Sequence, residues 1–221
     1  MHNRVSFAVV VASLFGQVAV AQTAAEVQQW NDGWAQFQAL SAVPLAARGM
    51  VSASQDLAIV IDGDVDDVFD IYSNVNNALG LHPFLVGLTP IRHTGKRLDF
   101  IAYEDIPLPD GTIFHGATIA QQRFHRRQHF YDADTFDVPG IITRQHITFT
   151  QISRTQVQVV EHLVFETYPI YIDQAVQGGV YAHYLVQVGL KAKIEAGLLK
   201  PIRFPRWLAG GHDGDDDDCD D

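Results

Sequence analysis

Apolar residues recur at helical spacing in three parts of the chain and form strand-like runs elsewhere. The first helix is expected over 23–40, where Thr23 and Glu26 match a capping box. Its apolar face consists of Val27, Trp30, Trp34 and Phe37. Two interpretations stay open: the helix packs on the surface of the domain, or this face binds a partner or a membrane surface.

A strand over 51–61 leads into two short helices. Asp64 can cap the first, which starts at Val65 and has apolar residues at helical spacing. A polar cluster over 73–77 interrupts the pattern, and a second apolar turn over 78–81 stops at His82-Pro83. Proline disfavours a helical residue before it. We therefore interpret the two short helices as a lid, after which the chain returns to the sheet.

Six β-rich runs follow, separated by turn signals. They are expected over 87–93, 97–104, 112–124, 128–136, 141–152 and 155–167. The last two runs, 141–152 and 155–167, can pair in two registers, in which the numbers of paired residues sum to 307 or to 308. The register that sums to 308 separates an apolar face from a polar face more clearly, so we expect it. It places Glu161 inward, opposite Ile147. A buried carboxylate needs a partner, so Glu161 is either paired in the core or a candidate acid or base.

The period then changes to that of one long helix over 174–200, which Pro201 ends. Its apolar face is expected to contact the sheet through Tyr181, Leu185, Val188, Ala192, Ala196 and Leu199. The order of elements predicts an α+β protein in which a curved antiparallel sheet wraps around the long C-terminal helix, with two short helices after the first strand.

This order resembles the START/Bet v 1-like superfamily, also called SRPBCC or polyketide cyclase-like, from about residue 51 to 199. The resemblance rests on VDDVFDIYSNVNN followed by LHPFL, on HITFTQISRTQVQVVEHLVFET and on AHYLVQVGLKAKIEAGL. It implies a helix-grip fold with a hydrophobic cavity between sheet and helix. Members bind lipids, sterols, polyketides or plant hormones, and some are cyclases or other enzymes.

Candidate site residues follow from the expected cavity wall. The catalytic candidates are Glu161 and His115, whose strand has two faces of nearly equal apolar character, so that its inward orientation stays open. His82 is either a ligand contact or a residue that caps and packs the turn. The candidate ligand contacts are His82, Phe84, Tyr103, Gln145, Ile147, Leu163, Tyr181, Tyr184, Leu185 and Val188.

Ten histidines raise the question of a metal site. His125 and His129 span an expected turn, and His146 and His162 can face each other on the outer surface. Neither pair has a convincing third ligand, and no HExxH motif occurs. GxSxG, Walker A and Rossmann patterns are also absent from the sequence. We therefore expect no metal and no cofactor.

The net charge of −11 is mainly a property of the C-terminal tail, which carries seven aspartates within 213–221. Nucleic-acid binding needs clustered basic residues, and the cluster His125-Arg126-Arg127 is too small, so nucleic acid is not an expected partner. The tail is expected to be disordered and solvated. The single cysteine, Cys219, lies in it and cannot form a disulfide within the chain.

Residues 1–21 resemble a secretory signal, with a weakly basic start, an apolar stretch over 5–16 and the small residues Ala19 and Ala21 before the expected cleavage site. A retained anchor or buried helix is the alternative. The expected division is a signal peptide (1–21), an N-terminal helix and linker (22–49), a START/Bet v 1-like domain (50–200) and an acidic extension (201–221). The protein is expected to be secreted or periplasmic, without stable membrane insertion after cleavage, and its oligomeric state stays open.

Three functions are compatible with these features. The first is an exported binding protein that holds a small hydrophobic ligand, such as a lipid or polyketide, between sheet and helix. The second is a polyketide cyclase-like enzyme that uses Glu161 and His115 as acid and base, so enzymatic activity stays open. The third is a surface interaction protein with a filled core and an exposed patch at Trp30 and Trp34.

The signal-like start predicts that the mature exported protein begins at or near Gln22. Mass-spectrometric sequencing of the N-terminus of exported protein tests this. Retention of Met1 on exported protein would contradict it.

Overall fold

A computed structural model describes residues 22–108, 110–137 and 140–201. The helices are α1 (Ala24–Ser41), α2 (Val65–Tyr72) and α3 (Ile172–Glu195), with 3₁₀ turns η1 (Leu45–Arg48), η2 (Val75–Ala78) and η3 (Arg126–Gln128). The strands are β1 (Val51–Asp62), β2 (Leu85–Thr94), β3 (Arg97–Pro107), β4 (Ile113–His125), β5 (Phe130–Asp137), β6 (Ile141–Ser153) and β7 (Gln156–Thr167). The expected signal peptide, the acidic tail and Cys219 lie outside the described residues.

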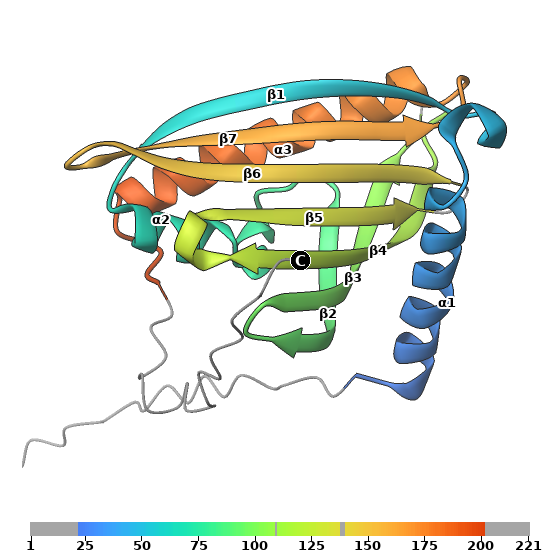
Figure 1. Cartoon of the computed structure of the whole chain (residues 1–221), viewed down its shortest axis with the longest axis horizontal. Helices are drawn as coiled ribbons and strands as arrows, with labels where there is room; N and C mark the ends of the chain where they lie inside the picture. Colours follow the sequence, from blue (N-terminus) through green and yellow to red (C-terminus); the bar gives the residue numbers. More distant parts are fainter. Residues whose placement is uncertain (1–21, 109, 138–139, 202–221) are drawn as a thin grey trace, which may run out of the picture.

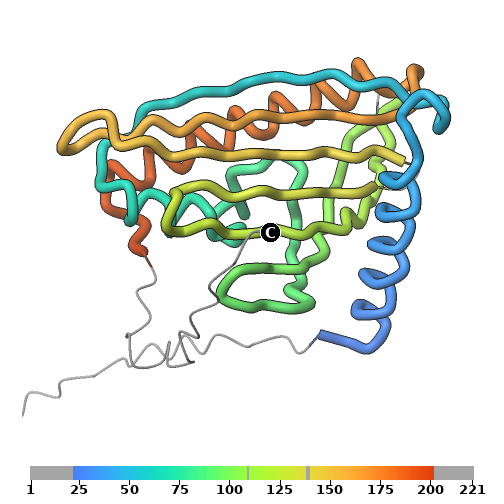
Figure 2. Tube along the Cα trace, in the orientation of Figure 1, coloured from blue at the N-terminus to red at the C-terminus, as the bar shows by residue number. Residues whose placement is uncertain are grey.

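The seven strands form one antiparallel sheet in the order β1-β7-β6-β5-β4-β3-β2. Its curvature is visible in Figure 1, where α3 lies behind β1 and β7. The trace in Figure 2 shows β1 running beside β7, although the two strands are far apart in the sequence. The predicted α+β helix-grip arrangement is thus confirmed.

The predicted register of the β6–β7 hairpin is also confirmed. Gln145 pairs with Leu163 and Ile147 with Glu161, so that the paired numbers sum to 308. Residues of this row face the concave side, where a core cluster surrounds them: Ile61, Val68, Phe69, Tyr72, Tyr131, Ala133, Ile147, Phe149, Val157, Val159 and Leu190. Burial of this large apolar surface holds the concave side together.

Helix α1 packs on the opposite, convex face. Its Thr23–Glu26 capping box is present. Trp30 is 3% exposed, packs against Ile101 and Ile119, and donates a 3.0 Å hydrogen bond from Nε1 to the Ala120 carbonyl. The interpretation of α1 as a packing helix is therefore confirmed, and an exposed tryptophan patch is not present on it.

The predicted apolar face of α3 is wrong for Tyr181, Val188, Ala192 and Ala196, which are exposed, whereas Leu185 is half-buried and Leu199 packs against the core. Val188 and Tyr181 are 40% and 53% exposed, whereas Ala182, Gln187 and Leu190 are buried. The physical reason is close approach. A Cβ at Gly179 would lie 2.4 Å from Phe165 Cε1, so the absence of a side chain lets α3 contact β7 there. Small and polar residues thus share the buried face with Leu190, while Tyr181, Tyr184 and Val188 lie on the exposed side.

Two element boundaries also differ from the prediction. Helix α3 ends at Glu195 rather than near residue 200, because Gly197 adopts a left-handed conformation with φ of 66°. The second short helix lies over 75–78 rather than 78–81, since the Asn74 side chain accepts a 3.2 Å hydrogen bond from the Asn76 amide and caps it.

Within the described residues, none of the helices combines the length and apolar character that crossing a membrane requires.

The two faces of α3 predict opposite responses to the same substitution. Leu190→Asp places an unpaired charge in the core and is expected to lower the free energy of unfolding by at least about 3 kcal/mol. Val188→Asp lies on the exposed face and is expected to change it by less than about 1 kcal/mol. Urea denaturation of both variants measures the difference. Equal losses would contradict the assignment of the buried face.

Candidate functional site

A carboxylate lies in the apolar interior between the sheet and α3. Glu161 on β7 is 2% exposed, and its neighbours Val159 and Leu163 on the same face are fully buried. The Tyr72 hydroxyl of α2 donates a hydrogen bond to Glu161 Oε1, and His183 Nδ1 of α3 lies 2.6 Å from Glu161 Oε2. The predicted inward position of Glu161 is confirmed, and its partners come from two helices.

Electrostatics keep the tyrosine in its donor form. Burial raises the pKa of Tyr72 well above its ordinary value, and the negative charge of Glu161 raises it further, while the nearby Gln187 amide offsets a smaller part of the rise. The phenol therefore stays protonated at physiological pH. His183 uses Nδ1 toward the carboxylate, which leaves its Nε2 nitrogen for a second partner.

Gln187 lies one helical turn after His183 on the buried face of α3. It is 2% exposed, and its amide is close enough to the Tyr72 hydroxyl to lower the pKa of that group, but its Nε2 forms no hydrogen bond of regular geometry among the described residues. An amide donor left without an acceptor in the interior is costly. This N–H group is therefore positioned to donate a hydrogen bond to an oxygen atom from outside the protein.

Two further carboxyl groups lie on the concave side of β3 and β5. The Thr118 hydroxyl is 3.2 Å from Glu104 Oε2 and also hydrogen-bonds to Asp137 Oδ1. Burial raises the pKa of Glu104 to about 7, with a contribution from the charge of Asp137, and burial raises the pKa of Asp137 to about 6. The Thr118 hydroxyl can donate its hydrogen to only one of the two carboxylates at a time. A proton bound to the other carboxyl group relieves the repulsion between Glu104 and Asp137.

His82 connects the lid to these acids. Its Nδ1 accepts hydrogen bonds from the amides of Phe84 and Leu85 at 3.3 and 3.1 Å, and its Nε2 lies 3.7 Å from Glu104 Oε1. Burial, together with the charge of His183, lowers the pKa of His82 to about 4, so the ring is neutral near pH 7. The His82-Pro83 step therefore fixes the turn after the lid and directs a polar ring toward Glu104.

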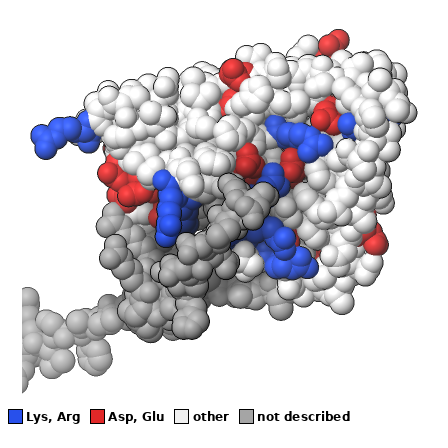
Figure 3. All heavy atoms as spheres, in the orientation of Figure 1, with Lys and Arg blue, Asp and Glu red and all other residues white. Residues whose placement is uncertain are grey.

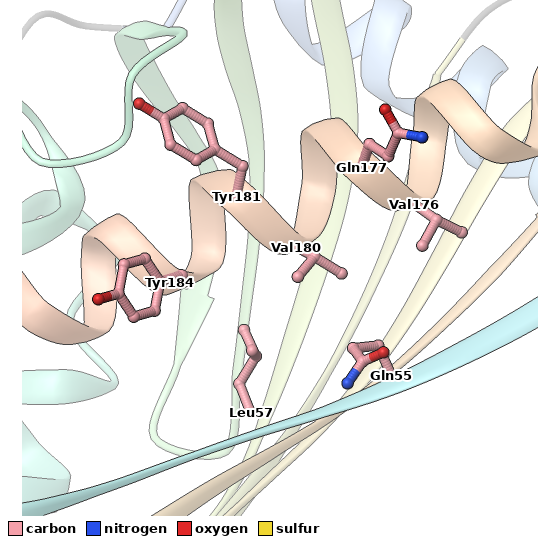
Figure 4. Close-up of a pocket in the computed structure, with 7 residues that line it drawn as sticks. All are labelled: Gln55, Leu57, Val176, Gln177, Val180, Tyr181 and Tyr184. Atoms are coloured by element: carbon pink, nitrogen blue, oxygen red, sulfur yellow. The ribbon is translucent and has the colours of Figure 1, made fainter.

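An apolar groove of about 440 Å³ runs between β1 and α3. In Figure 4, Val176 and Val180 point from α3 toward Gln55 and Leu57 of β1, whereas the Tyr181 ring points away from β1 and the Tyr184 ring lies beside the helix. Leu57 is paired with Glu161 across the β1–β7 ladder. The floor of the groove is thus one strand away from the buried carboxylate.

The structure distributes the predicted ligand contacts over several places. Gln145, Ile147 and Leu163 lie on the concave face, and the Phe84 ring packs edge-on against His82 with centroids 5.8 Å apart. Tyr181 and Tyr184 line the groove, whereas Val188 is on the exposed face of α3 and Leu185 is half-buried. Their roles as ligand contacts stay predictions.

Two predicted site residues lie on the wrong side of the sheet. His115 shares the convex face with Ile119, and its side chain is 75% exposed and 2.6 Å from Asp105. Tyr103 packs on the same face beside α1, where its hydroxyl is 3.3 Å from Glu26. The reason is that α1 buries the Ile101–Ile119 row on the convex face, so both faces of β4 are apolar and its alternation does not identify the concave one.

The residues that partner Glu161 were not identified from sequence. His183 and Gln187 follow Gly179 at intervals of four, which is one face of a helix. This row of small and polar residues is the signal that was available. Glu104 lies on the same face of β3 as the buried Ala102, and Thr118 lies on the same face of β4 as the buried Ala120. Because both faces of these strands are apolar, the sequence does not indicate which of them faces inward.

Neither a family model nor a curated protein sequence matches the chain. Solved structures do resemble it. The Thermus thermophilus protein TTHA0849 aligns with a TM-score of 0.54 at 12% identity over 66% of this chain and 99% of that one. The Zhui aromatase/cyclase from Streptomyces sp. R1128 aligns with a TM-score of 0.54 at 10% identity over 73% of this chain and all of that one.

A third similar structure is StfQ, the di-domain aromatase/cyclase of the steffimycin biosynthetic pathway. It aligns with a TM-score of 0.50 at 16% identity over 65% of this chain and 45% of that one. At these identities the likeness shows the fold. The chain shares the helix-grip fold of these structures, as its sequence predicts.

The raised pKa of Glu104 predicts a pH-dependent contribution to stability. Its folded-state pKa of about 7 exceeds the ordinary value of 4.5, so the contribution is full below pH 4.5 and is lost as the pH rises through 7. The free energy of unfolding of the wild type, relative to Glu104→Gln, is expected to fall by about 1–3 kcal/mol over this range.

Urea denaturation of both proteins at several pH values measures this difference. Comparison with the variant is needed because the lowered pKa of His82 has the opposite effect, increasing stability as the pH rises from about 4 to 6.5. A difference that is flat with pH would show that Glu104 is not protonated in the folded protein.

Proposed function

We propose that this protein is an exported binding protein for a small, mainly apolar ligand that carries one polar group. The apolar part lies in the groove between β1 and α3, and the polar group reaches the interior at Glu161, His183 and Gln187. The observation that carries the proposal is the pairing of Leu57, on the floor of the groove, with Glu161 in the buried network. The signal-like start of the chain supports export, to the periplasm or to the outside of the cell.

The size and lining of the groove fit this class of ligand. Binding sites for small molecules typically enclose about 300–1,000 Å³ and combine apolar walls with few polar groups. The groove has a volume of about 440 Å³ and contains valine, leucine and tyrosine side chains beside two glutamines. The Nε2 of Gln187 supplies a donor that forms no hydrogen bond of regular geometry within the described residues, which favours a ligand with a carbonyl or hydroxyl oxygen.

A second candidate function is acid–base catalysis on such a ligand. The specific observation is the 2.6 Å contact between Glu161 and His183, which is a carboxylate–imidazole pair in an apolar interior. An aromatase/cyclase among the structures of the same fold is compatible with this function. The two functions differ in whether the ligand is changed.

Filling the groove tests the binding function. Val180→Trp adds a large side chain to the groove, whereas Val188→Trp makes the same change on the exposed face of α3 and is the matched control. Native mass spectrometry and organic extraction of the mature protein identify co-purifying molecules. The fluorescent apolar probe 1-anilinonaphthalene-8-sulfonate then measures affinity. Val180→Trp is expected to lose the co-purified molecule and weaken probe binding at least about ten-fold, or ~1.4 kcal/mol.

Equal binding by the two tryptophan variants would contradict the groove as the site. Thermal melts check that both remain folded.

Glu161→Gln separates the two functions once a ligand is identified, because an amide keeps a polar contact but cannot act as a base. Binding that survives with loss of turnover would identify an enzyme. Glu161→Leu leaves Tyr72 and His183 unpaired and is expected to destabilise the fold.

A further inference from the structure

Four titratable residues form a straight row across four strands on the convex face. Asp56 of β1 is paired with His162 of β7, His162 with His146 of β6, and His146 with Asp132 of β5. The two histidine side chains are 50% and 48% exposed. They line a shallow polar groove of about 280 Å³, on the face where Figure 3 shows acidic and basic side chains close together.

Each histidine is held by the aspartate on its outer side. His162 Nδ1 lies 2.6 Å from Asp56 Oδ1, and His146 Nδ1 lies 2.8 Å from Asp132 Oδ1. The carboxylates favour a proton on Nδ1, which leaves the lone pair on Nε2 of each ring. This carboxylate–histidine arrangement is the one that orients imidazole ligands of metal ions.

The direction of these contacts fixes which edge of each ring faces the other histidine. In imidazole, Nδ1 and Cδ2 lie on opposite sides of the Cβ–Cγ axis, and Nε2 lies on the Cδ2 side. Because the two Nδ1 atoms face outward along the row, the Cδ2–Nε2 edge of each ring lies on the side of the other histidine. Residues directly opposite on antiparallel strands have Cβ atoms about 4.5–5.5 Å apart, so one ion can reach both nitrogens.

We propose that His146 and His162 form a surface site for a divalent transition-metal ion, with Cu²⁺ bound most tightly. Imidazole ligands suit Cu²⁺, Ni²⁺ and Zn²⁺, and the affinity for a given site is generally highest for Cu²⁺. Across the described ranges, no group of three or more His, Cys, Asp or Glu side chains is arranged to hold a metal. The two histidines are therefore the protein ligands, and water completes the coordination.

The positive charges nearest to the site are compensated. Arg123 and Arg144 also line the polar groove, but Arg123 pairs with Asp134 at 2.8 Å and Arg144 with Glu166 at 3.0 Å. The aspartates that orient the histidines add negative charge at both ends of the row. This distribution favours a cation at the centre of the row.

Calorimetric titration of tag-free mature protein with CuCl₂ tests the proposal, with NiCl₂ as a second probe. His146→Gln and His162→Gln are each expected to lower the affinity of the proposed site for Cu²⁺ by at least about ten-fold. Asp132→Asn removes the carboxylate that orients His146 and is also expected to lower the affinity for Cu²⁺ about ten-fold. His115→Gln is the matched control, because His115 contacts Asp105 in the same way but is paired across the β3–β4 ladder with that aspartate rather than with a histidine.

Electron paramagnetic resonance of the Cu²⁺ complex adds an independent readout, since two imidazole nitrogens give a characteristic hyperfine pattern. Its loss in both histidine variants and its retention in His115→Gln would support the site. Unchanged Cu²⁺ affinity in the His146→Gln/His162→Gln double variant would overturn the proposal. So would equal weakening by His115→Gln. Neither result bears on ligand binding in the groove on the other face.

Discussion

The contact of Glu161 with Tyr72 and His183 is the interaction on which the concave side of this molecule depends. It joins β7 to α2 and to α3, which are the three parts that must meet for the sheet to close around the helix. A buried carboxylate is tolerated only with such partners. The same hydrogen bonds therefore place two helices and create a polar site in an apolar interior, so that the polar group needed for folding is also the one available for the proposed ligand contact.

Helix α3 is shaped by this arrangement. Gly179 and Ala182 allow it to approach the sheet, and His183 and Gln187 bring polar atoms into the interior. Leu190 is buried beside them, whereas Tyr181 and Tyr184 are exposed and line the groove with β1. A helix that buries its small and polar face has little apolar contrast between its two sides, which distinguishes α3 from an ordinary amphipathic helix.

The sequence was sufficient for the order of elements, the hairpin register and the inward position of Glu161, because these follow from local spacing and from the cost of burying charge. It was insufficient where both sides of an element are apolar. The convex face of β4 is covered by α1, so His115 was assigned to the wrong side. The site also depends on contacts between distant segments, such as Glu161 with Tyr72, which no local pattern contains.

The pairing of β1 with β7 has a consequence for how this chain reaches its folded state. The first strand of the sheet joins the last, from Val51 with Thr167 to Asp62 with Gln156, and α3 packs mainly on these two strands. Contacts between residues this distant in sequence slow folding, because loop closure must precede the gain from pairing. Strands β2 to β7, in contrast, pair successively with their neighbours in the sequence. The edge that carries the groove is thus expected to assemble last, only after nearly the whole chain has been synthesised.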